Sequence, residues 1–128
     1  MTAILPDFEK EVEFDTNLLL HGEELFNALD EIERAPLPSG VIPLLDFVDK
    51  RGSAESYGVE PHPDAVPPYQ WYSAGDGLAT VRALREHFAA DPDVVQYGPE
   101  LLADIEALET MLLSAQKSGS RFHLIWAQ

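Results

Sequence analysis

The sequence has no cysteine, few basic residues and no long hydrophobic run. Without cysteine there are no disulfide bonds, thiolate metal ligands or cysteine nucleophiles. Only 8 Lys and Arg stand against 23 Asp and Glu, and the formal net charge of −15 excludes a conventional nucleic-acid backbone binder and a polybasic membrane-surface protein. The longest aliphatic run, Leu18–Leu20, is far below the ~20 residues of a membrane span. Because Asp7 and Glu9 lie near the start without an early basic run, no secretory signal is expected, and we predict a soluble, cytoplasmic protein.

The length and the hydrophobic content suit one domain. The chain has 128 residues, of which 45% are hydrophobic. A chain of this length buries about two thirds of its unfolded surface, which is enough for a core without disulfides or metals. The sequence therefore predicts a single domain over residues 1–128 and argues against wholesale disorder.

Hydrophobic periodicity predicts a mostly helical α+β domain with about four helices and a short strand near each end. Val12 and Phe14 alternate with acids, which predicts a strand over residues 10–15. Phe122, Leu124 and Trp126 alternate in the same way near the C-terminus and predict a second strand with these three side chains on the core face. Two strands at opposite ends of the chain can pair and close the domain.

Four segments have helical spacing of apolar residues. They are residues 21–34, 41–48, about 74 or 76 to 90, and 99–117. Ser73 and Asp76 have the spacing of a capping arrangement before the third helix, and Gly119 is the expected residue just beyond the fourth. The pattern also predicts exposure for Asp7, Glu9, Glu11, Glu13 and Asp15, and burial for Leu29, Ile32, Leu84, Leu108 and Leu124.

Between the second and third predicted helices lies a proline-rich internal loop, residues 52–68. It carries Pro61, Pro63, Pro67 and Pro68, too many prolines for a helix or a central strand. A loop of this length inside one domain is either functional or poorly ordered.

Motifs that carry chemistry are missing. The histidines are His21, His62, His87 and His123, and no two of them have the spacing that places two metal ligands on one helix face. No serine lies in a G-x-S-x-G elbow, and the glycines around Asp76 do not form a phosphate loop. For His123, the nearest polar companion on its strand face is expected to be Arg121. We therefore predict no catalytic residues, no metal site and no cofactor, and we favour a non-enzymatic protein.

Three aromatic residues, Tyr69, Trp71 and Tyr72, follow the proline-rich loop. Two interpretations are open. Such residues fill the edge of a core when their polar tips reach water. They are also typical of binding hot spots.

Acidic residues concentrate in the N-terminal half. From Asp7 to Glu33 there are ten acids and one base, Lys10. A solubilising surface explains such a field, and so does a surface that attracts a basic protein. The first hypothesis is therefore a non-enzymatic protein that binds a basic protein partner, as immunity proteins and inhibitors do, an analogy of charge and size alone. Its candidate contact residues are Glu11, Glu13, Asp15, Glu23, Glu24, Asp30, Glu31, Tyr69, Trp71 and Tyr72.

Two alternatives remain. The second hypothesis is a small enzyme or ligand-binding domain with a pocket under the 52–68 loop. Its lining residues would be His62, Trp71, Tyr72 and Asp76. The third is a homo-oligomeric structural subunit, because core faces and dimer faces look alike in a sequence.

Overall fold

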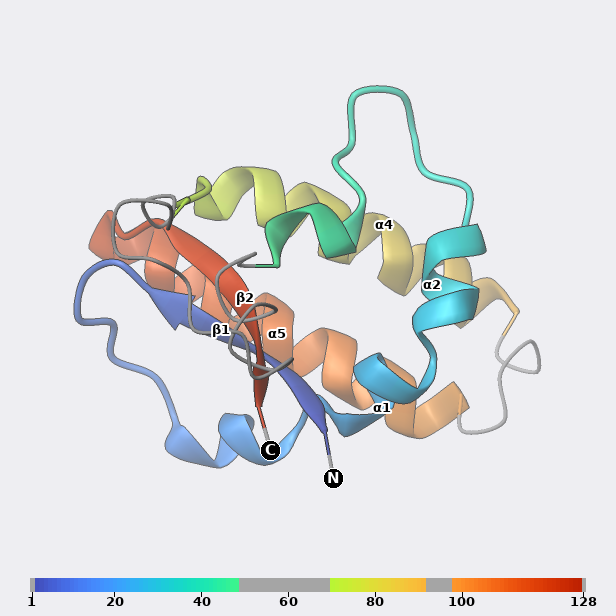
Figure 1. Cartoon of the computed structure of the whole chain (residues 1–128), viewed down its shortest axis with the longest axis horizontal. Helices are drawn as coiled ribbons and strands as arrows, with labels where there is room; N and C mark the ends of the chain where they lie inside the picture. The colour runs from blue at the N-terminus through green and yellow to red at the C-terminus, as the bar shows by residue number, and fades with distance from the viewer. Residues whose placement is uncertain (1, 49–69, 92–97, 128) are drawn as a thin grey trace, which may run out of the picture.

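The computed structural model describes residues 2–48, 70–91 and 98–127. Within these ranges a pair of strands crosses in front of a long helix, a second long helix lies beside the first, and shorter helical segments flank them (Figure 1). The elements are β1 (Ala3–Phe8), η1 (Thr16–Leu20), α1 (Glu23–Asn27), α2 (Leu29–Arg34), η2 (Leu44–Phe47), α4 (Ala74–Ala90), α5 (Gly98–Ser118) and β2 (Phe122–Ala127). The predicted class, a mostly helical α+β domain closed by strands from the two ends of the chain, is confirmed.

The sheet joins the two ends of the described chain. β1 pairs antiparallel with β2 from Ala3 opposite Ala127 to Phe8 opposite Phe122. Tyr72 adds a short bridge on the other edge of β2, where its N–H donates to the carbonyl of Phe122 at 2.8 Å and its carbonyl accepts from the N–H of Phe122 at 2.9 Å. Strand β2 therefore lies between β1 and the segment that leads into α4.

The C-terminal strand lies where the alternation predicted it, whereas the position of the N-terminal strand was wrong. Residues 10–15 are not a strand, and β1 ends at Phe8. The reason is that β2 begins only at Phe122, so the chain beyond Lys10 has no neighbouring strand to pair with. The amide of Lys10 instead donates to the hydroxyl of Ser120 at 3.0 Å.

Helices α4 and α5 run antiparallel and form the main helical layer (Figure 1). Both lie within about a residue of their predicted ranges. Ser73 caps α4, because its hydroxyl accepts from the N–H of Asp76 at 3.0 Å, and Gly119 ends α5 with a φ of +70°. These local signals were sufficient because each depends on residues within one helical turn.

The two helices predicted in the N-terminal half are broken into short pieces. The helix expected over 21–34 divides at Ala28 into α1 and α2, and the segment expected to be helical over 41–48 forms only the 3-10 turn η2.

Gly22 precedes α1 with a φ of +122°, and a Cβ at this position would lie 2.4 Å from the carbonyl oxygen of Ile4. The close approach of β1 to Gly22 therefore decides where α1 begins. Pro43 is extended rather than helical, so it precedes η2 instead of opening a helix.

The burial predictions hold with one exception. The acids Asp7, Glu9, Glu11, Glu13 and Asp15 are exposed. Ile32, Leu84, Leu108 and Leu124 are buried, but Leu29, which opens α2 after the break at Ala28, is only half-buried against the core. On β2, Phe122 and Leu124 are buried and Trp126 is half-buried against the core.

None of the helices in the described segments combines the length and the hydropathy that crossing a membrane requires. The 52–68 loop lies outside the described residues, so the prediction about its order stays a prediction.

Candidate functional site

The most unusual surface of the described chain surrounds the 3-10 helix η1. No residue of η1 is buried, and Leu20 is 83% exposed, with Leu19 beside it at 38%. Both leucines, together with Leu5 and Glu23, line a shallow depression of about 260 Å³. Glu11, Glu13 and Asp15 precede η1 directly and are exposed. We call Glu11, Glu13, Asp15, Leu19, Leu20 and Glu23 the acidic–leucine surface.

Three of the described arginines pair with carboxylates elsewhere, whereas Arg34 of α2 forms no ion pair within the described residues. Arg82 and Arg85 of α4 both bind Glu109 of α5, with Nε of Arg82 at 3.1 Å from Oε2 of Glu109. Arg121 binds Glu9 through two nitrogen atoms, and its Nε lies 3.1 Å from Oε1 of Glu9. Among the residues that the structure describes, no ion pair involves a carboxylate of the acidic–leucine surface, although Lys10 directly precedes Glu11.

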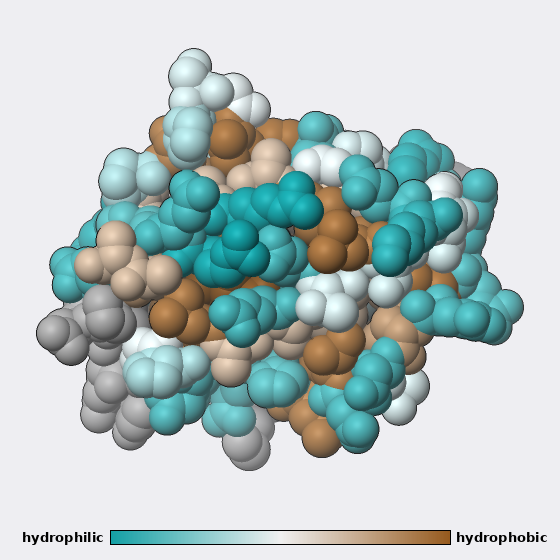
Figure 2. Space-filling view, turned by 180° about the vertical axis from the view of Figure 1, so that it is seen from behind, coloured by the Kyte–Doolittle hydropathy of each residue, from teal (hydrophilic) through white to brown (hydrophobic). Residues whose placement is uncertain are grey.

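The other acidic candidates lie farther along the molecule. Asp30 of α2 is exposed, whereas Glu31 of α2 and Glu24 of α1 are half-buried. In Figure 1, η1 and α2 lie toward opposite ends of the long axis, so the predicted acids are spread over the molecule rather than gathered into one field. Seen from behind, hydrophilic residues dominate the surface, with hydrophobic patches between them (Figure 2).

Two of the three aromatic candidates pack at the edge of the core. The ring of Trp71 stacks on the ring of His123, with centroids 4.2 Å apart and planes 10° apart. The ring of Tyr72 contacts Phe47 edge-on at 5.2 Å, and both Trp71 and Tyr72 are half-buried. These contacts fit the core-edge interpretation. Tyr69 lies outside the described residues.

His123 is 1% exposed and is held on both sides of its ring. Nε2 lies 2.9 Å from Oδ2 of Asp7, and Nδ1 lies 3.1 Å from the carbonyl oxygen of Gln70. The expectation that Arg121 would be its polar companion was wrong, because Arg121 instead binds Glu9. With both ring nitrogens engaged inside the fold, the imidazole has no nitrogen left to take a proton from a substrate.

Two carboxylates are buried and hold helices together. Asp104 of α5 accepts from Nδ1 of His21 at 3.0 Å and from the backbone N–H of Glu24 at 2.8 Å, so it caps the first turn of α1 from another helix. Glu109 of α5 accepts from the two arginines of α4. The sequence did not predict either role, because nothing local distinguishes these acids from exposed ones on α5.

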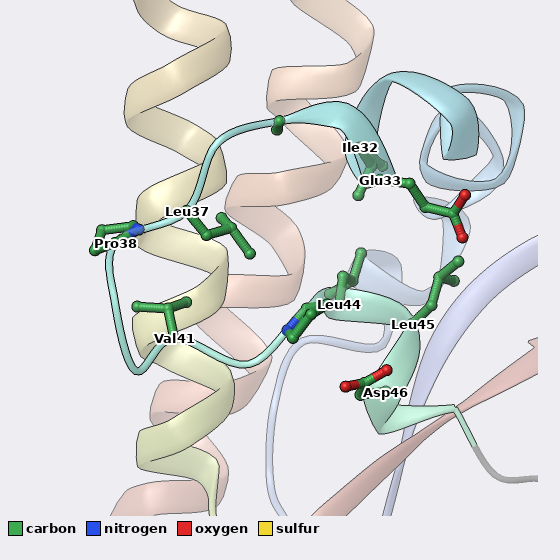
Figure 3. Close-up of a pocket in the computed structure, with 10 residues that line it drawn as sticks. Ile32, Glu33, Leu37, Pro38, Val41, Leu44, Leu45 and Asp46 are labelled. Atoms are coloured by element: carbon green, nitrogen blue, oxygen red, sulfur yellow. The ribbon is translucent and has the colours of Figure 1, made fainter.

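The residues predicted to line a pocket do not come together in the described part of the chain. Asp76 is exposed in the first turn of α4, Trp71 and Tyr72 make the contacts given above, and His62 lies outside the described ranges. A cavity of about 410 Å³ occurs elsewhere, between the end of α2 and η2 (Figure 3). Its lining residues are Ile32, Glu33, Ala35, Leu37, Pro38, Val41, Pro43, Leu44, Leu45 and Asp46.

No cluster of three His, Asp or Glu side chains suited to a metal ion occurs among the described residues. Every buried side-chain nitrogen or oxygen atom of these residues has a hydrogen-bond partner. The buried polar side chains of the described residues therefore stabilise the fold through these hydrogen bonds.

Comparison of the chain with protein-family models, with curated proteins and with solved structures finds no match.

Proposed function

We propose that this protein is a non-enzymatic binding protein that recognises a basic protein partner through the acidic–leucine surface. The observation that carries the proposal is Leu20, which is 83% exposed on a segment whose neighbouring acids in the chain, Asp15 and Glu23, form no ion pair within the described residues. Burying such a leucine against a partner contributes about 1.5–3 kcal/mol. The carboxylates near it in the chain attract a basic surface.

The electrostatics of the whole chain support the same partner class. A net charge of −15 attracts a basic protein from a distance and raises its association rate, and salt weakens this effect. The apolar contact at Leu19 and Leu20 depends much less on salt. Association by this surface therefore combines a salt-sensitive on-rate with a leucine-dependent off-rate.

The engaged ring of His123 supports a non-enzymatic role for its pair with Asp7. Both ring nitrogens of His123 are bound within the fold. A general base has to reach a substrate proton with a free lone pair. The His123–Asp7 pair is therefore better suited to stabilise the domain than to catalyse a reaction.

The test begins with capture of basic proteins from the source cell on the immobilised chain at low and at high salt. A captured protein is then purified, and its dissociation constant is measured with the parent chain, with Leu20→Ala and with Glu11→Gln/Glu13→Gln. We expect Leu20→Ala to weaken binding about tenfold or more, and the double variant to lower the association rate and its salt dependence.

The matched control is Glu106→Gln/Glu86→Gln, which removes the same charge from exposed positions on α5 and α4. Recovery of no basic protein at low salt would overturn the proposal. Equal loss of affinity in the control and in the Glu11/Glu13 variant would assign binding to net charge alone. Light scattering of the free chain tests the homo-oligomer hypothesis, since a second copy seated on Leu20 would make Leu20→Ala dissociate the oligomer.

A further inference from the structure

The cavity between α2 and η2 has an apolar interior. Its floor is formed by Ile32, Ala35 and Leu44, which are buried, and its sides by Leu37, Val41 and Leu45, which are half-buried. At about 410 Å³ it lies within the range of about 300–1,000 Å³ that is usual for small-molecule sites. The close-up shows the chain between α2 and η2 looping around this space, with Leu37, Pro38 and Val41 on one side of it (Figure 3).

Two carboxylates stand at the rim. Glu33 belongs to the last turn of α2 and Asp46 to η2, and both are exposed. Figure 3 places them on the side of Leu45, away from Leu37 and Val41. Within the described residues neither carboxylate forms an ion pair, and the cavity has no positively charged lining residue. The cavity therefore combines an apolar interior with negative charge at one side of its rim.

We propose that this cavity binds an aliphatic primary amine, with the alkyl chain on Ile32 and Leu44 and the ammonium group at the rim, beside the carboxylate of Glu33 or of Asp46. An ammonium group donates three hydrogen bonds, and its charge-assisted bond to a carboxylate is stronger than a bond between neutral groups. An alkyl chain gains by leaving water for the apolar floor. A carboxylate at the same position would be repelled, and a neutral alcohol would lack the charge–charge attraction. The site is separate from the acidic–leucine surface, so it does not rest on the function proposed above.

The first experiment titrates the purified chain with butylammonium, hexylammonium, hexanol and hexanoate while methyl signals are followed by NMR. We expect hexylammonium to bind more tightly than butylammonium by about fourfold per added methylene group. The largest shifts are expected at the methyl groups of Val41, Leu44 and Leu45. Hexanoate is expected not to bind. Equal affinity for hexanol and hexylammonium, or shifts centred on other methyl groups, would overturn the proposal.

Paired variants separate the site from the general attraction of an acidic protein for cations. Glu33→Gln/Asp46→Asn removes the rim charges, and Glu86→Gln/Glu106→Gln removes the same charge from exposed positions on α4 and α5. We expect the rim variant to weaken hexylammonium binding roughly tenfold and the control to leave it within about twofold. Equal losses in the two variants would show non-specific attraction and refute the site.

A third variant tests the interior independently of charge. Val41→Phe places a larger side chain in the wall of the cavity, on a loop residue that is only half-buried. We expect it to abolish the dependence of affinity on alkyl chain length while the chain stays folded by circular dichroism. Unchanged affinity and unchanged chain-length dependence in Val41→Phe would contradict binding inside the cavity.

Discussion

Asp7 and His123 lie directly opposite each other in the sheet, and Nε2 of the buried imidazole is 2.9 Å from Oδ2 of the half-exposed carboxylate. The other ring nitrogen faces the carbonyl of Gln70 at 3.1 Å, and the ring stacks on Trp71. One side chain thus connects β1, β2 and the segment that leads into α4. Because these three segments are distant in the sequence, the contact helps to set how the ends of the described chain meet.

Replacing Asp7 tests the importance of this contact. Asp7→Ala removes an acceptor from a ring that is 1% exposed, and a buried polar group that loses its partner costs about 1–3 kcal/mol. We expect the free energy of unfolding, measured by urea denaturation, to fall by this amount. Glu13→Ala is the control, since Glu13 is exposed and is expected to change stability by less than about 0.5 kcal/mol. Equal stability of the two variants would contradict a structural role for the pair.

Gly77 of α4 is expected to resist a substitution that usually stabilises a helix. Alanine is favoured over glycine in a helix by about 0.5–1 kcal/mol. A Cβ at Gly77, however, would lie 2.5 Å from Cζ of Phe122 and 3.1 Å from Cδ1 of Leu112. Because overpacking of a core costs about 1–3 kcal/mol, we expect Gly77→Ala to lower the thermal midpoint.

Gly75 is the matched control in the same helix. A Cβ there would meet its nearest atom, in the side chain of Gln116, at 3.5 Å, which is ordinary contact. We therefore expect Gly75→Ala to keep or raise the thermal midpoint. A gain of stability in Gly77→Ala as well would show that Phe122 can move away, and would contradict tight packing of β2 on α4.

Asp104 is expected to be required for the position of α1. Asp104→Ala leaves the N–H of Glu24 and the ring of His21 without their acceptor, so unfolding should become easier by about 1–3 kcal/mol. Asp104→Asn keeps one oxygen atom and should cost less. Hydrogen exchange at the Glu24 amide checks the mechanism, because it should become faster in the alanine variant. Unchanged exchange at this amide would refute the proposed cap.

The exposed pair of Glu9 and Arg121 predicts a specific pH dependence. The hydrogen bond from Arg121 holds the pKa of Glu9 below its ordinary value of 4.5, and the nearby positive charges act in the same direction. Since the folded-state pKa is depressed, the pair stabilises the fold above pH 4.5, and this contribution disappears as the pH falls through the folded-state pKa.

Arg121→Gln should therefore raise the pKa of Glu9 toward its ordinary value, as measured by NMR titration of its carboxyl carbon. The same substitution at Lys117, which forms no ion pair in the described part of the chain, is the control. An unchanged pKa in Arg121→Gln would contradict the hydrogen bond.

Local sequence signals located the two long helices correctly. The apolar spacing of α4 and α5, the Ser73 cap and the glycine after α5 all act within a few residues. The elements of the N-terminal half were harder to predict, because they are short and depend on contacts with other segments. The strand expected at 10–15 has the right alternation, but strand pairing needs a neighbour, and the neighbour ends beside Phe8. Periodicity alone does not specify where the partner strand begins.

Likewise, only some features of the candidate site could be predicted from the sequence. Exposure of the early acids followed from alternation and charge, and it was confirmed. Exposure of Leu20 was not anticipated, since a run of three leucines usually indicates core. The cavity between α2 and η2 was also missed, because its lining comes from a loop whose path depends on what it packs against.

The sequence by itself determined the class of domain, the two long helices and the acidic character of the surface, because these depend on composition and on neighbours within a few residues. Only the tertiary structure decided that His123 meets Asp7, that Asp104 caps α1 and that Glu33 and Asp46 stand over one cavity. The first two contacts join residues 116 and 80 positions apart, and the cavity is lined by α2, by η2 and by the loop between them. Contacts over such distances depend on how the whole chain packs. A local sequence pattern carries no information about that packing.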